Sequence, residues 1–454
     1  MTIGIGLLGL GTVGAGVAGI LASPAGRHPL VAELALKRIA VRDLNRPRPI
    51  DLPAAILSTD AEAVVDDPSV DIVVEVMGGL EPARSLILRA IAAGKPVVTA
   101  NKAVIARYGE EIAAAAAAKG VYVLIEAAVG GGIPIIEPLK QSLGGNRITK
   151  VSGIINGTTN YILSRMADEG AAYGAVLADA QELGYAEADP AADVEGADAA
   201  DKIAILTALA FGGSVPRSAI PTEGINRLDA RDVGYAAQLG YVVKLLAVAE
   251  NPGGAANSAQ SAASQALDVR VHPTLLPKSH PLAGVNGVNN AILVEGDPVG
   301  QVMFYGPGAG AGPTASAVVA DILNIAGIWA VARPGVAGPG VAGPGASGAG
   351  AALDPLLAAS RWRKCHLIDS AQTRHRNYIR LRTSDEAGVI GKIGSCFGAA
   401  GVSIQSIMQF EAQGERAEIV VITHEVLEAN FRQALLAIEA LADVQAVEAC
   451  LRTL

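Results

Sequence analysis

A short acidic segment with a single lysine carries most of the potential chemistry of this chain. Residues 184–202 hold six carboxylates and one lysine, although only 17% of the whole sequence is charged. The apolar pattern predicts a helix from Glu195 to about Phe211, so Asp198 and Lys202 lie one turn apart on the same face. A carboxylate at that spacing can orient the lysine. The alternative interpretation is a solvated acidic loop that caps a helix.

The loop before this predicted helix adds further carboxylates. Pro190 and Gly196 interrupt regular structure there, so the loop presents three acidic side chains near the helix N-terminus, those of Glu187, Asp189 and Asp193. Such a concentration of anions calls for cationic partners.

A glycine turn near the start of the chain has the order that a dinucleotide site requires. The apolar run Ile3–Leu8 precedes the turn, and small residues suited to a helix follow it. Gly9 would form the turn, Gly11 would let the backbone approach a pyrophosphate, and Gly14 would permit close packing of helix and strand. The helix N-terminus would face the phosphates with its partial positive charge. The predicted cofactor contacts in this turn are Gly9, Gly11, Thr12, Val13 and Gly14.

Strand and helix patterns alternate through the same region. Apolar runs at Leu34–Val41, Asp71–Val76 and Pro96–Thr99 predict strands. Helical patterns at Glu81–Ala93 and Tyr108–Lys119 separate or follow them. This alternation predicts an α/β fold with a parallel, doubly wound sheet, a Rossmann domain.

The residues after two of these strands indicate which cofactor binds. Arg42 and Asp43 end the second strand, and Arg46 and Arg48 follow. An acidic residue at this place takes ribose hydroxyls and an arginine accommodates a 2′-phosphate, so we expect NADP(H) to be preferred and NAD(H) to be possible. The arginines could instead only solvate a loop.

Thr99, Asn101 and Lys102 come just past another strand end, where ligands of open α/β sheets bind. Lys102 could reach a cofactor or a substrate carbonyl or carboxylate. It could equally be a surface lysine at the start of a helix.

Composition excludes several other classes of protein. The 454 residues carry a net charge of −9, so the chain offers no basic surface for nucleic acid or for an anionic membrane. Three cysteines are scattered over the last quarter without metal-ligand spacing, which fits a reducing cytoplasm. The first 26 residues are uncharged, but glycines interrupt them too often for a signal peptide or a membrane span.

Taken together, these motifs resemble homoserine dehydrogenase over nearly the whole chain. The resemblance rests on five segments: Gly9–Gly14, Asn101–Lys102, Glu126–Pro134, Gly153–Tyr161 and, most specifically, Gly184–Lys202. None departs from the family pattern. The family interconverts L-homoserine and L-aspartate 4-semialdehyde with NAD(P), on the route to threonine, methionine and isoleucine.

The resemblance implies roles for the acidic segment. Lys202 would accept the hydroxyl proton and return it in the reverse reaction. Glu187 and Asp198 would bind the substrate ammonium, with Asp193 in support. Lys102 would be a second active-site lysine that contacts substrate or cofactor.

The resemblance also implies roles for glycine-rich segments. Gly184 and the turn at Gly306 and Gly308 would let backbone approach the nicotinamide. A structural Na⁺ would be held by Glu126, Val129, Gly131 and Ile133, since oxygen ligands suit a hard cation. The alternative there is a glycine turn with one buried acid that pairs elsewhere.

Two other functions compete with this interpretation. A phosphate-dependent semialdehyde dehydrogenase of the same pathway needs a thiolate nucleophile, yet no cysteine precedes Cys365. A catalytically silent amino-acid and NADP sensor on the same scaffold would not require both Lys102 and Lys202.

The last third of the chain predicts a regulatory module. Thr314–Val331 reads as a helix, which the resemblance implies returns to the nucleotide-binding half, and Pro334–Ala352 is a Gly/Pro/Ala-rich linker. Beyond it, a βαββαβ pattern is ferredoxin-like. It resembles an ACT domain, which binds amino acids at interfaces between copies. Threonine is the expected effector, and a purely oligomerising module is the alternative.

The expected organisation therefore has five parts, in an enzyme that we expect to form a homodimer or homotetramer. They are a Rossmann domain at 1–134, an α+β substrate and dimerisation domain at 135–305, a return helix at 306–333, a linker and connector at 334–375, and an ACT domain at 376–454.

Overall fold

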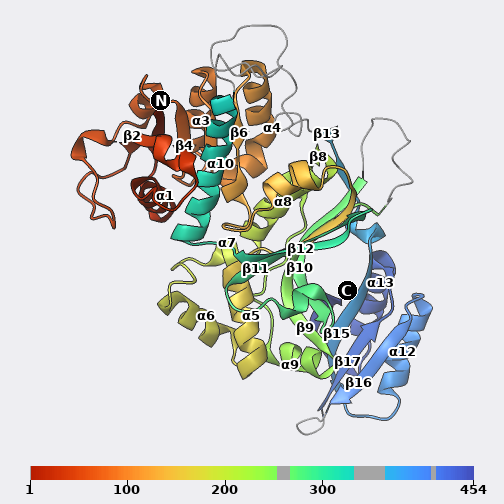
Figure 1. The fold of residues 1–454 in the computed structure, drawn as a ribbon. Coiled ribbons are helices and arrows are strands. Elements are labelled where there is room, and N and C mark those ends of the chain that lie inside the picture. Colours follow the sequence, from red (N-terminus) through yellow and green to blue (C-terminus); the bar gives the residue numbers. More distant parts are fainter. Residues whose placement is uncertain (1, 253–265, 332–362, 411–415, 454) are drawn as a thin grey trace.

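The computed structural model describes residues 2–252, 266–331, 363–410 and 416–453. Figure 1 shows the amino-terminal domain in red and orange, and the carboxyl-terminal domain in blue at the opposite end of the molecule. The predicted linker at Pro334–Ala352 lies outside the described residues.

The amino-terminal domain is built on a parallel six-stranded sheet, as the sequence predicts. The strands follow the order β3-β2-β1-β4-β5-β6. Their bounds are β1 (Ile3–Leu8), β2 (Leu34–Ala40), β3 (Leu57–Ser58), β4 (Ile72–Glu75), β5 (Val97–Thr99) and β6 (Val123–Leu124). Both faces are covered, because Ile72 and Val74 of β4 join one apolar core while Val73 between them joins another.

Helices supply the other side of each core. They are α1 (Thr12–Ala22), α2 (Ala61–Asp66), α3 (Ala83–Ala92) and α4 (Lys102–Lys119). The sequence pattern places the start of α4 at Tyr108, which is wrong by six residues. Asn101 caps the helix, since its side chain accepts a hydrogen bond from the amide of Val104.

The long helix α10 (Ala311–Val331) returns to this domain and packs on α1. A Cβ added to Gly16 would lie 2.5 Å from the Ala311 carbonyl oxygen, so the two helices are in close contact. By length and composition α10 could cross a membrane, but half of its most apolar stretch is buried inside the protein. It is therefore a core helix of the nucleotide-binding half.

The middle of the chain forms a mixed sheet that helices cover. Its strands are β7 (Arg147–Ile154), β9 (Tyr241–Glu250), β10 (Ala266–Pro277), β11 (Asn289–Asp297) and β12 (Gly300–Pro307). Its helices are α5 (Gly157–Glu169), α6 (Tyr173–Glu182), α7 (Ala191–Val194), α8 (Ala197–Phe211) and α9 (Ala230–Gln238). Short elements complete the description: η1 (Pro29–Glu33), η2 (Ala54–Ile56), η3 (Glu126–Ala128), η4 (Pro138–Ser142), η5 (Arg217–Ala219), η7 (Pro281–Gly284), η8 (Ser370–Gln372), β8 (Gly213–Ser214), β13 (Arg363–Lys364), β14 (His366–Leu367) and β18 (Val426–Leu427).

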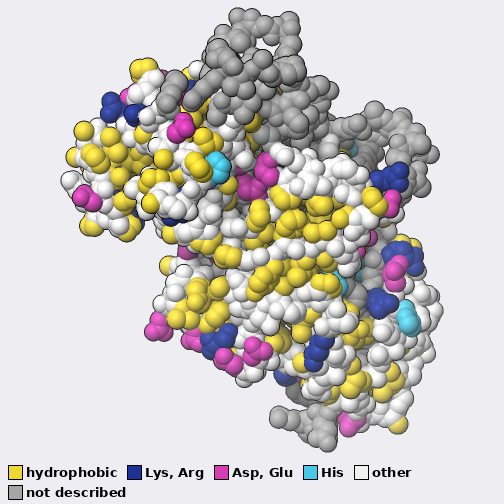
Figure 2. All heavy atoms as spheres, viewed as in Figure 1, with side chains coloured by type: hydrophobic (Ala, Val, Ile, Leu, Met, Phe, Trp, Pro, Cys, Tyr) yellow, Lys and Arg dark blue, Asp and Glu magenta, His cyan; other side chains and the backbone are white. Residues whose placement is uncertain are grey.

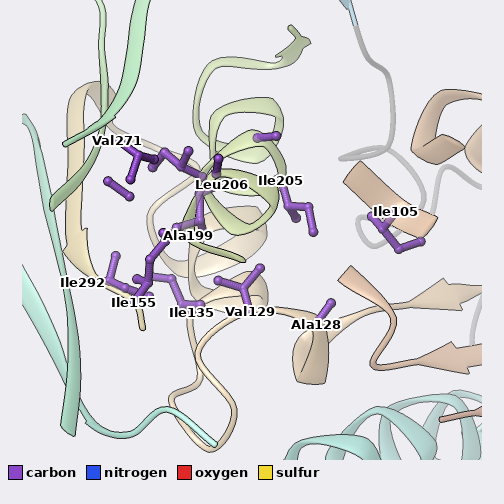
Figure 3. Close-up of a cluster of buried hydrophobic side chains, with 14 of the residues drawn as sticks. Ile105, Ala128, Val129, Ile135, Ile155, Ala199, Ile205, Leu206, Val271 and Ile292 are labelled. Carbon is purple, nitrogen blue, oxygen red and sulfur yellow. The ribbon is translucent and has the colours of Figure 1, made fainter. Parts of the chain in front are cut away.

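Helix α8 lies in the centre of the largest apolar core. Figure 3 shows Ala199, Ile205 and Leu206 of this helix among side chains from α4, β10, β11 and the segment before α5. The edge strand β12 is more open, because Met303 and Tyr305 are 42% and 55% exposed. Figure 2 shows hydrophobic side chains gathered across the middle of the molecule on the face in view.

The carboxyl-terminal domain has the predicted βαββαβ order. It consists of β15 (Arg374–Ser384), α12 (Val389–Ala399), β16 (Ile404–Phe410), β17 (Arg416–Thr423), α13 (Glu428–Glu439) and β19 (Val444–Thr453). Strand β19 also pairs with β10 at Thr274 and Leu275. One continuous sheet, in the order β12-β11-β7-β9-β10-β19-β15-β17-β16, therefore joins the two domains.

A buried ionic contact fastens the same junction. Arg380 of β15 donates hydrogen bonds of 2.7 and 3.1 Å to the carboxylate of Asp232 on α9. The Tyr378 hydroxyl donates to the same carboxylate at 3.0 Å. Arg380 and Asp232 are each 1% exposed, so neither charge can turn to solvent if its partner is removed.

We predict that Asp232→Ala lowers the free energy of unfolding by about 3–5 kcal/mol, because it leaves the buried guanidinium without its main partner. Chemical denaturation followed by circular dichroism measures the change. Glu425→Ala removes an exposed partner of Arg374 in the same domain and should cost about 1 kcal/mol or less. Equal losses in the two variants would contradict the importance of the buried contact.

Candidate active site

The N-terminal turn of α8 holds a carboxylate shared by two lysines. The helix begins at Ala197, two residues later than the sequence predicts, after Gly196 in the left-handed region with φ +85°. Lys102 Nζ lies 2.6 Å from Asp198 Oδ1, and Lys202 Nζ lies 2.8 Å from Asp198 Oδ2. The structure thus brings together three predicted site residues from two helices.

Asn156 lies within the Gly153–Tyr161 motif, but the sequence analysis does not predict it as a site residue. Its Nδ2 donates to Asp193 Oδ1 at 2.7 Å and to Asp198 Oδ2 at 2.9 Å. Its Oδ1 accepts from the amide of Thr159 and caps α5. Asn156 therefore fixes the distance between the two carboxylates. Its place directly after a strand and before a helix is the signal that could have found it.

The three charged groups of the cluster shift one another's pKa values, and the two lysines shift in opposite directions. Burial lowers the pKa of Lys202, and the second cation, Lys102, adds to this lowering against the pull of Asp198. Lys102 is also disfavoured by burial, but the Asp198 carboxylate outweighs that effect and raises its pKa. Burial acts to raise the pKa of Asp198, yet the two ammonium groups hold it far below its ordinary range. Lys202 is therefore the lysine that loses its proton more readily.

The protein supplies acceptors for two of the three N–H groups of Lys202. Its ammonium donates to the Ile155 carbonyl oxygen at 2.6 Å and to Asp198 at 2.8 Å. An ammonium carries three N–H groups, so the third can point to a bound molecule.

The loop before α7 is more exposed than this cluster. Gly184 and the Glu187 side chain both lie at the surface, and Gly184 has φ +75°. Within the described part of the chain, no hydrogen bond or ion pair joins the Glu187 carboxylate to Asp198 or the lysines. Burial raises the pKa of Asp193, which lies nearer to the cluster because Asn156 bridges it to Asp198.

A cavity of about 660 Å³ lies at the carboxyl ends of β1, β2 and β4. Gly9, Gly11, Arg42, Arg46 and Arg48 line it, on the glycine turn and on the loop after β2. This is the edge of the sheet where dinucleotides bind.

Glycine is required at different positions of the turn for different physical reasons. A Cβ on Gly14 would lie 2.2 Å from the Gly9 carbonyl oxygen, so Gly14 serves close packing. A Cβ on Gly11 would meet nothing within 4 Å, so this glycine leaves space open instead. Thr12 and Val13 begin α1 and do not line the cavity.

Thr99 lies deeper, where its hydroxyl donates to Glu75 at 2.6 Å. The neighbouring Asn101 connects the cavity to the charged cluster. Its Nδ2 donates to the carbonyl oxygen of Gly79, which lines the cavity, and the next residue is Lys102. The predicted dinucleotide site and the cluster of Lys102, Asp198 and Lys202 thus meet at the start of α4.

Gly306, predicted to lie in a turn, is part of strand β12, and Gly308 follows the end of that strand; this segment packs against the predicted cation loop. The amide of Gly132 donates to the Pro307 carbonyl oxygen at 3.1 Å. A Cβ on Gly131 would lie 2.4 Å from the Gly308 carbonyl oxygen, so the two segments are in close contact. Glu126 holds the end of this loop through hydrogen bonds to backbone amides. Its carboxylate accepts hydrogen bonds from the amides of Ile135, Ile136 and Glu137. Most of its acceptor capacity therefore goes to backbone, as in the alternative of a glycine turn with a buried acid.

Comparison with protein families divides the chain as the fold does. Residues 9–126 match the NAD binding domain of homoserine dehydrogenase, residues 134–323 match homoserine dehydrogenase, and residues 377–443 match the ACT domain. A homoserine dehydrogenase of Synechocystis sp. is 55% identical over 454 residues, which cover 100% of both chains.

Solved structures agree with these matches. A homoserine dehydrogenase from Thiobacillus denitrificans is 42% identical with a TM-score of 0.86, and the match covers 100% of this chain and 98% of that one. A hyperthermophilic archaeal homoserine dehydrogenase in complex with NADPH is 28% identical with a TM-score of 0.58. That match covers 71% of this chain and 97% of that one.

We predict that Gly11→Val abolishes dinucleotide binding without unfolding the protein. The new side chain fits the free protein but fills the space that the phosphates need. Titration of cofactor fluorescence measures the affinity, and thermal unfolding checks the fold. In the contrasting variant Gly14→Ala, the collision with Gly9 should lower the unfolding temperature. Normal cofactor affinity in Gly11→Val would place the dinucleotide elsewhere.

Proposed function

The chain belongs to the homoserine dehydrogenase family, with a carboxyl-terminal ACT domain, and we propose that the cluster of Lys102, Asp198 and Lys202 performs its proton transfer. The enzyme interconverts L-homoserine and L-aspartate 4-semialdehyde with a nicotinamide dinucleotide. The observation that supports the proposal best is the Asp198 carboxylate between two lysines. One of them, Lys102, directly follows Asn101, whose side chain donates to the wall of the cofactor cavity at Gly79.

The bound dinucleotide would supply or accept the hydride. Lys202 would take the hydroxyl proton during oxidation of homoserine and return it to the alkoxide during reduction. Its lowered pKa suits the first direction, which needs a neutral amine, and its third N–H suits the second. Asp198 keeps the Nζ atom in place in both protonation states.

We assign the substrate ammonium to a set of carboxylates rather than to Asp198 alone. Both oxygens of Asp198 already bind a lysine ammonium. Asp193 is half-buried, lies beside Asp198 through Asn156, and would be stabilised as an anion by a cationic ligand. Glu187 is exposed and would complete the set from the loop side. Lys102, whose pKa is raised, would remain charged and bind the substrate or polarise its carbonyl group.

The proposed cofactor is NADP(H), with NAD(H) tolerated. Arg42 and Arg46 line the cavity beside Asp43. Arg48 also lines the cavity, but its side chain donates to the carbonyl oxygens of Leu44 and Arg46, so it shapes the loop. The archaeal relative in complex with NADPH supports the same choice.

A structural Na⁺ is proposed only with backbone ligands. The carbonyl oxygens of Val129, Gly131 and Ile133 belong to a tight turn and are the donors that a hard cation prefers. The Glu126 carboxylate is already bound to three amides, so we assign it to shaping the loop.

We also propose a cytoplasmic homodimer or homotetramer that threonine inhibits. The exposed apolar residues on β12 are compatible with a contact between copies. In the described part of the chain no disulfide bond joins the cysteines, which is compatible with a reducing compartment.

We predict that Lys202→Ala lowers turnover by roughly 10²–10⁴-fold, the usual contribution of a positioned acid or base. Cofactor affinity should stay unchanged, because Lys202 does not line the cofactor cavity. In the wild type, homoserine oxidation should rise with pH as Lys202 becomes neutral, and should level off below pH 10.5 because its pKa is lowered from that value.

Initial rates of reduced-nicotinamide formation across pH provide the measurement. Lys119→Ala, at the exposed far end of α4, is the control and should behave as the wild type. Undiminished turnover in Lys202→Ala would remove this residue from its proposed role.

We further predict that Arg42→Ala raises the KM for NADPH roughly tenfold or more and leaves the KM for NADH nearly unchanged. The variant removes a charged partner of the 2′-phosphate, and such hydrogen bonds are worth about 1.5–3 kcal/mol. Steady-state kinetics with both cofactors measure the split, and the exposed Arg27→Ala serves as control. Equal weakening with both cofactors would contradict a phosphate contact.

A further inference from the structure

A second carboxylate of helix α8 binds groups from both domains. Asp201 lies three residues after Asp198, and its Oδ1 accepts a hydrogen bond from Arg217 Nε at 2.6 Å. Its Oδ2 accepts one from Arg107 Nη1 at 3.1 Å. Arg217 begins η5 in the catalytic domain, whereas Arg107 lies on α4 of the nucleotide-binding domain. Asp201 therefore joins the two domains, as Asp198 does.

This bridge of Arg107, Asp201 and Arg217 is shielded from water on its catalytic side. The side chains of Asp201 and Arg217 are 10% and 15% exposed, and Arg217 also donates to the Ala197 carbonyl oxygen at 3.0 Å. Arg107 is more open, with 36% of its side chain exposed. Because the carboxylate is already fixed in its own domain, its contact with Arg107 is stronger than that of two freely moving surface groups.

The two interdomain ion pairs lie at different points along the same pair of helices. Asp198 and Asp201 are three residues apart on α8 and share one side of it, and their partners Lys102 and Arg107 are five residues apart on α4. The two helices lie against each other between the domains (Figure 1). Helices joined by one ion pair can rotate about it, whereas a second pair further along fixes their relative orientation. The bridge at Asp201 supplies this second constraint.

The packing beside the bridge is incomplete, which makes the ionic contact more important. A cavity of about 880 Å³ lies between α4 and the segments 214–219 and 365–367, and Arg107 and Arg217 both line it. Apolar side chains therefore do not fill the space next to the bridge. Across the same cavity the Ser214 hydroxyl donates to Glu110, but that contact is exposed and does not reach α8.

Loss of the bridge would change the charges around Lys202, the residue that follows Asp201. The charged groups that face Lys202 are Asp198 on its own helix, Lys102 from α4 and Asp193 from α7. The Lys102 ammonium acts to lower the pKa of Lys202, and the two carboxylates act to raise it. If α4 moves away, Lys202 keeps both carboxylates and loses the neighbouring cation, so its pKa rises. The pH at which Lys202 becomes neutral thus reports the position of α4.

We propose that Arg107 is a positioning residue for the reaction. Through Asp201 it holds α4 against α8, and so it keeps the Lys102 ammonium at the Asp198 carboxylate. Arg107 does not line the cofactor cavity, so it acts on the pair of lysines and not on dinucleotide binding. The inference rests on the proposed proton transfer by Lys202 and goes beyond it, because it assigns a role to a residue outside the cluster.

Initial rates of homoserine oxidation across pH, measured with Arg107→Ala, test the proposal. We expect kcat to fall roughly 10–100-fold, since a displacement of about 1 Å in an active site can cost this much. The inflection of the pH profile should move to higher pH by about 0.5 unit or more, because Lys202 then loses its proton less readily. The KM for the cofactor should stay unchanged.

Two matched variants accompany this measurement. Arg107→Lys keeps a cation that can reach Asp201, so it should restore most of kcat and the wild-type inflection. Arg89→Ala removes an exposed arginine whose ion pairs, with Glu62 and Asp66, stay inside the nucleotide-binding domain, and it should behave as the wild type. Thermal unfolding checks each variant. A lower unfolding temperature of Arg107→Ala with the wild-type kcat and pH profile would overturn the proposal.

A double variant tests whether Arg107 acts through Lys102. In a Lys102→Ala background, Arg107→Ala should lower turnover little further, because the group that it positions is already absent. A full additional loss in the double variant would contradict the proposal.

Distinct results separate this inference from the proposed function. If Lys202→Ala keeps its turnover while Arg107→Ala still lowers turnover in a manner that depends on Lys102, the proposed proton transfer fails and the positioning role stands. If Lys202→Ala loses turnover while Arg107→Ala keeps the wild-type kcat and inflection, the proton transfer stands and the positioning role fails.

Discussion

The Asp198 carboxylate is the interaction on which the active site depends. It is buried, and each of its oxygens binds one lysine, so removing it would leave two ammonium groups facing each other. Its place in the first turn of α8 is favourable, because the helix dipole stabilises an anion there. The same dipole disfavours the ammonium of Lys202 one turn later. One carboxylate thus joins the nucleotide-binding half, through α4, to the catalytic half, through α8.

The sequence predicts the part of this contact that joins Asp198 to Lys202, because that part needs only local rules, but it does not predict the ion pair of Asp198 with Lys102. The spacing of Asp198 and Lys202 follows from helical periodicity, and the glycine turn follows from the order of strand, turn and helix. The start of α4 was missed because an apolar pattern does not show a cap, whereas the Asn101 side chain sets the helix start. Asn156 was missed as a site residue for a related reason. Its role depends on two carboxylates that are 37 and 42 residues away in the chain.

The junction of the domains could not be predicted from local patterns. The ferredoxin-like order is visible in the sequence, but the pairing of β19 with β10 depends on how two separately folded sheets meet. The same holds for Asp232, a plain helical aspartate in the sequence that becomes the partner of a buried arginine 148 residues later. Such contacts arise from tertiary packing, and the local sequence around the two partners does not predict them.

The two lysines show how the same environment can divide two roles between similar side chains. Lys102 is partly open to solvent, with 40% of its side chain exposed, while the side chain of Lys202 is 10% exposed. Both face Asp198, so the difference in their pKa shifts comes mainly from the deeper burial of Lys202, and the neighbouring charge of Lys102 adds to the lowering. The open lysine stays charged and can bind, whereas the enclosed lysine is the one that can give up its proton. The depth of each lysine, set by the packing of α4 against α8, therefore favours proton loss from Lys202 over proton loss from Lys102.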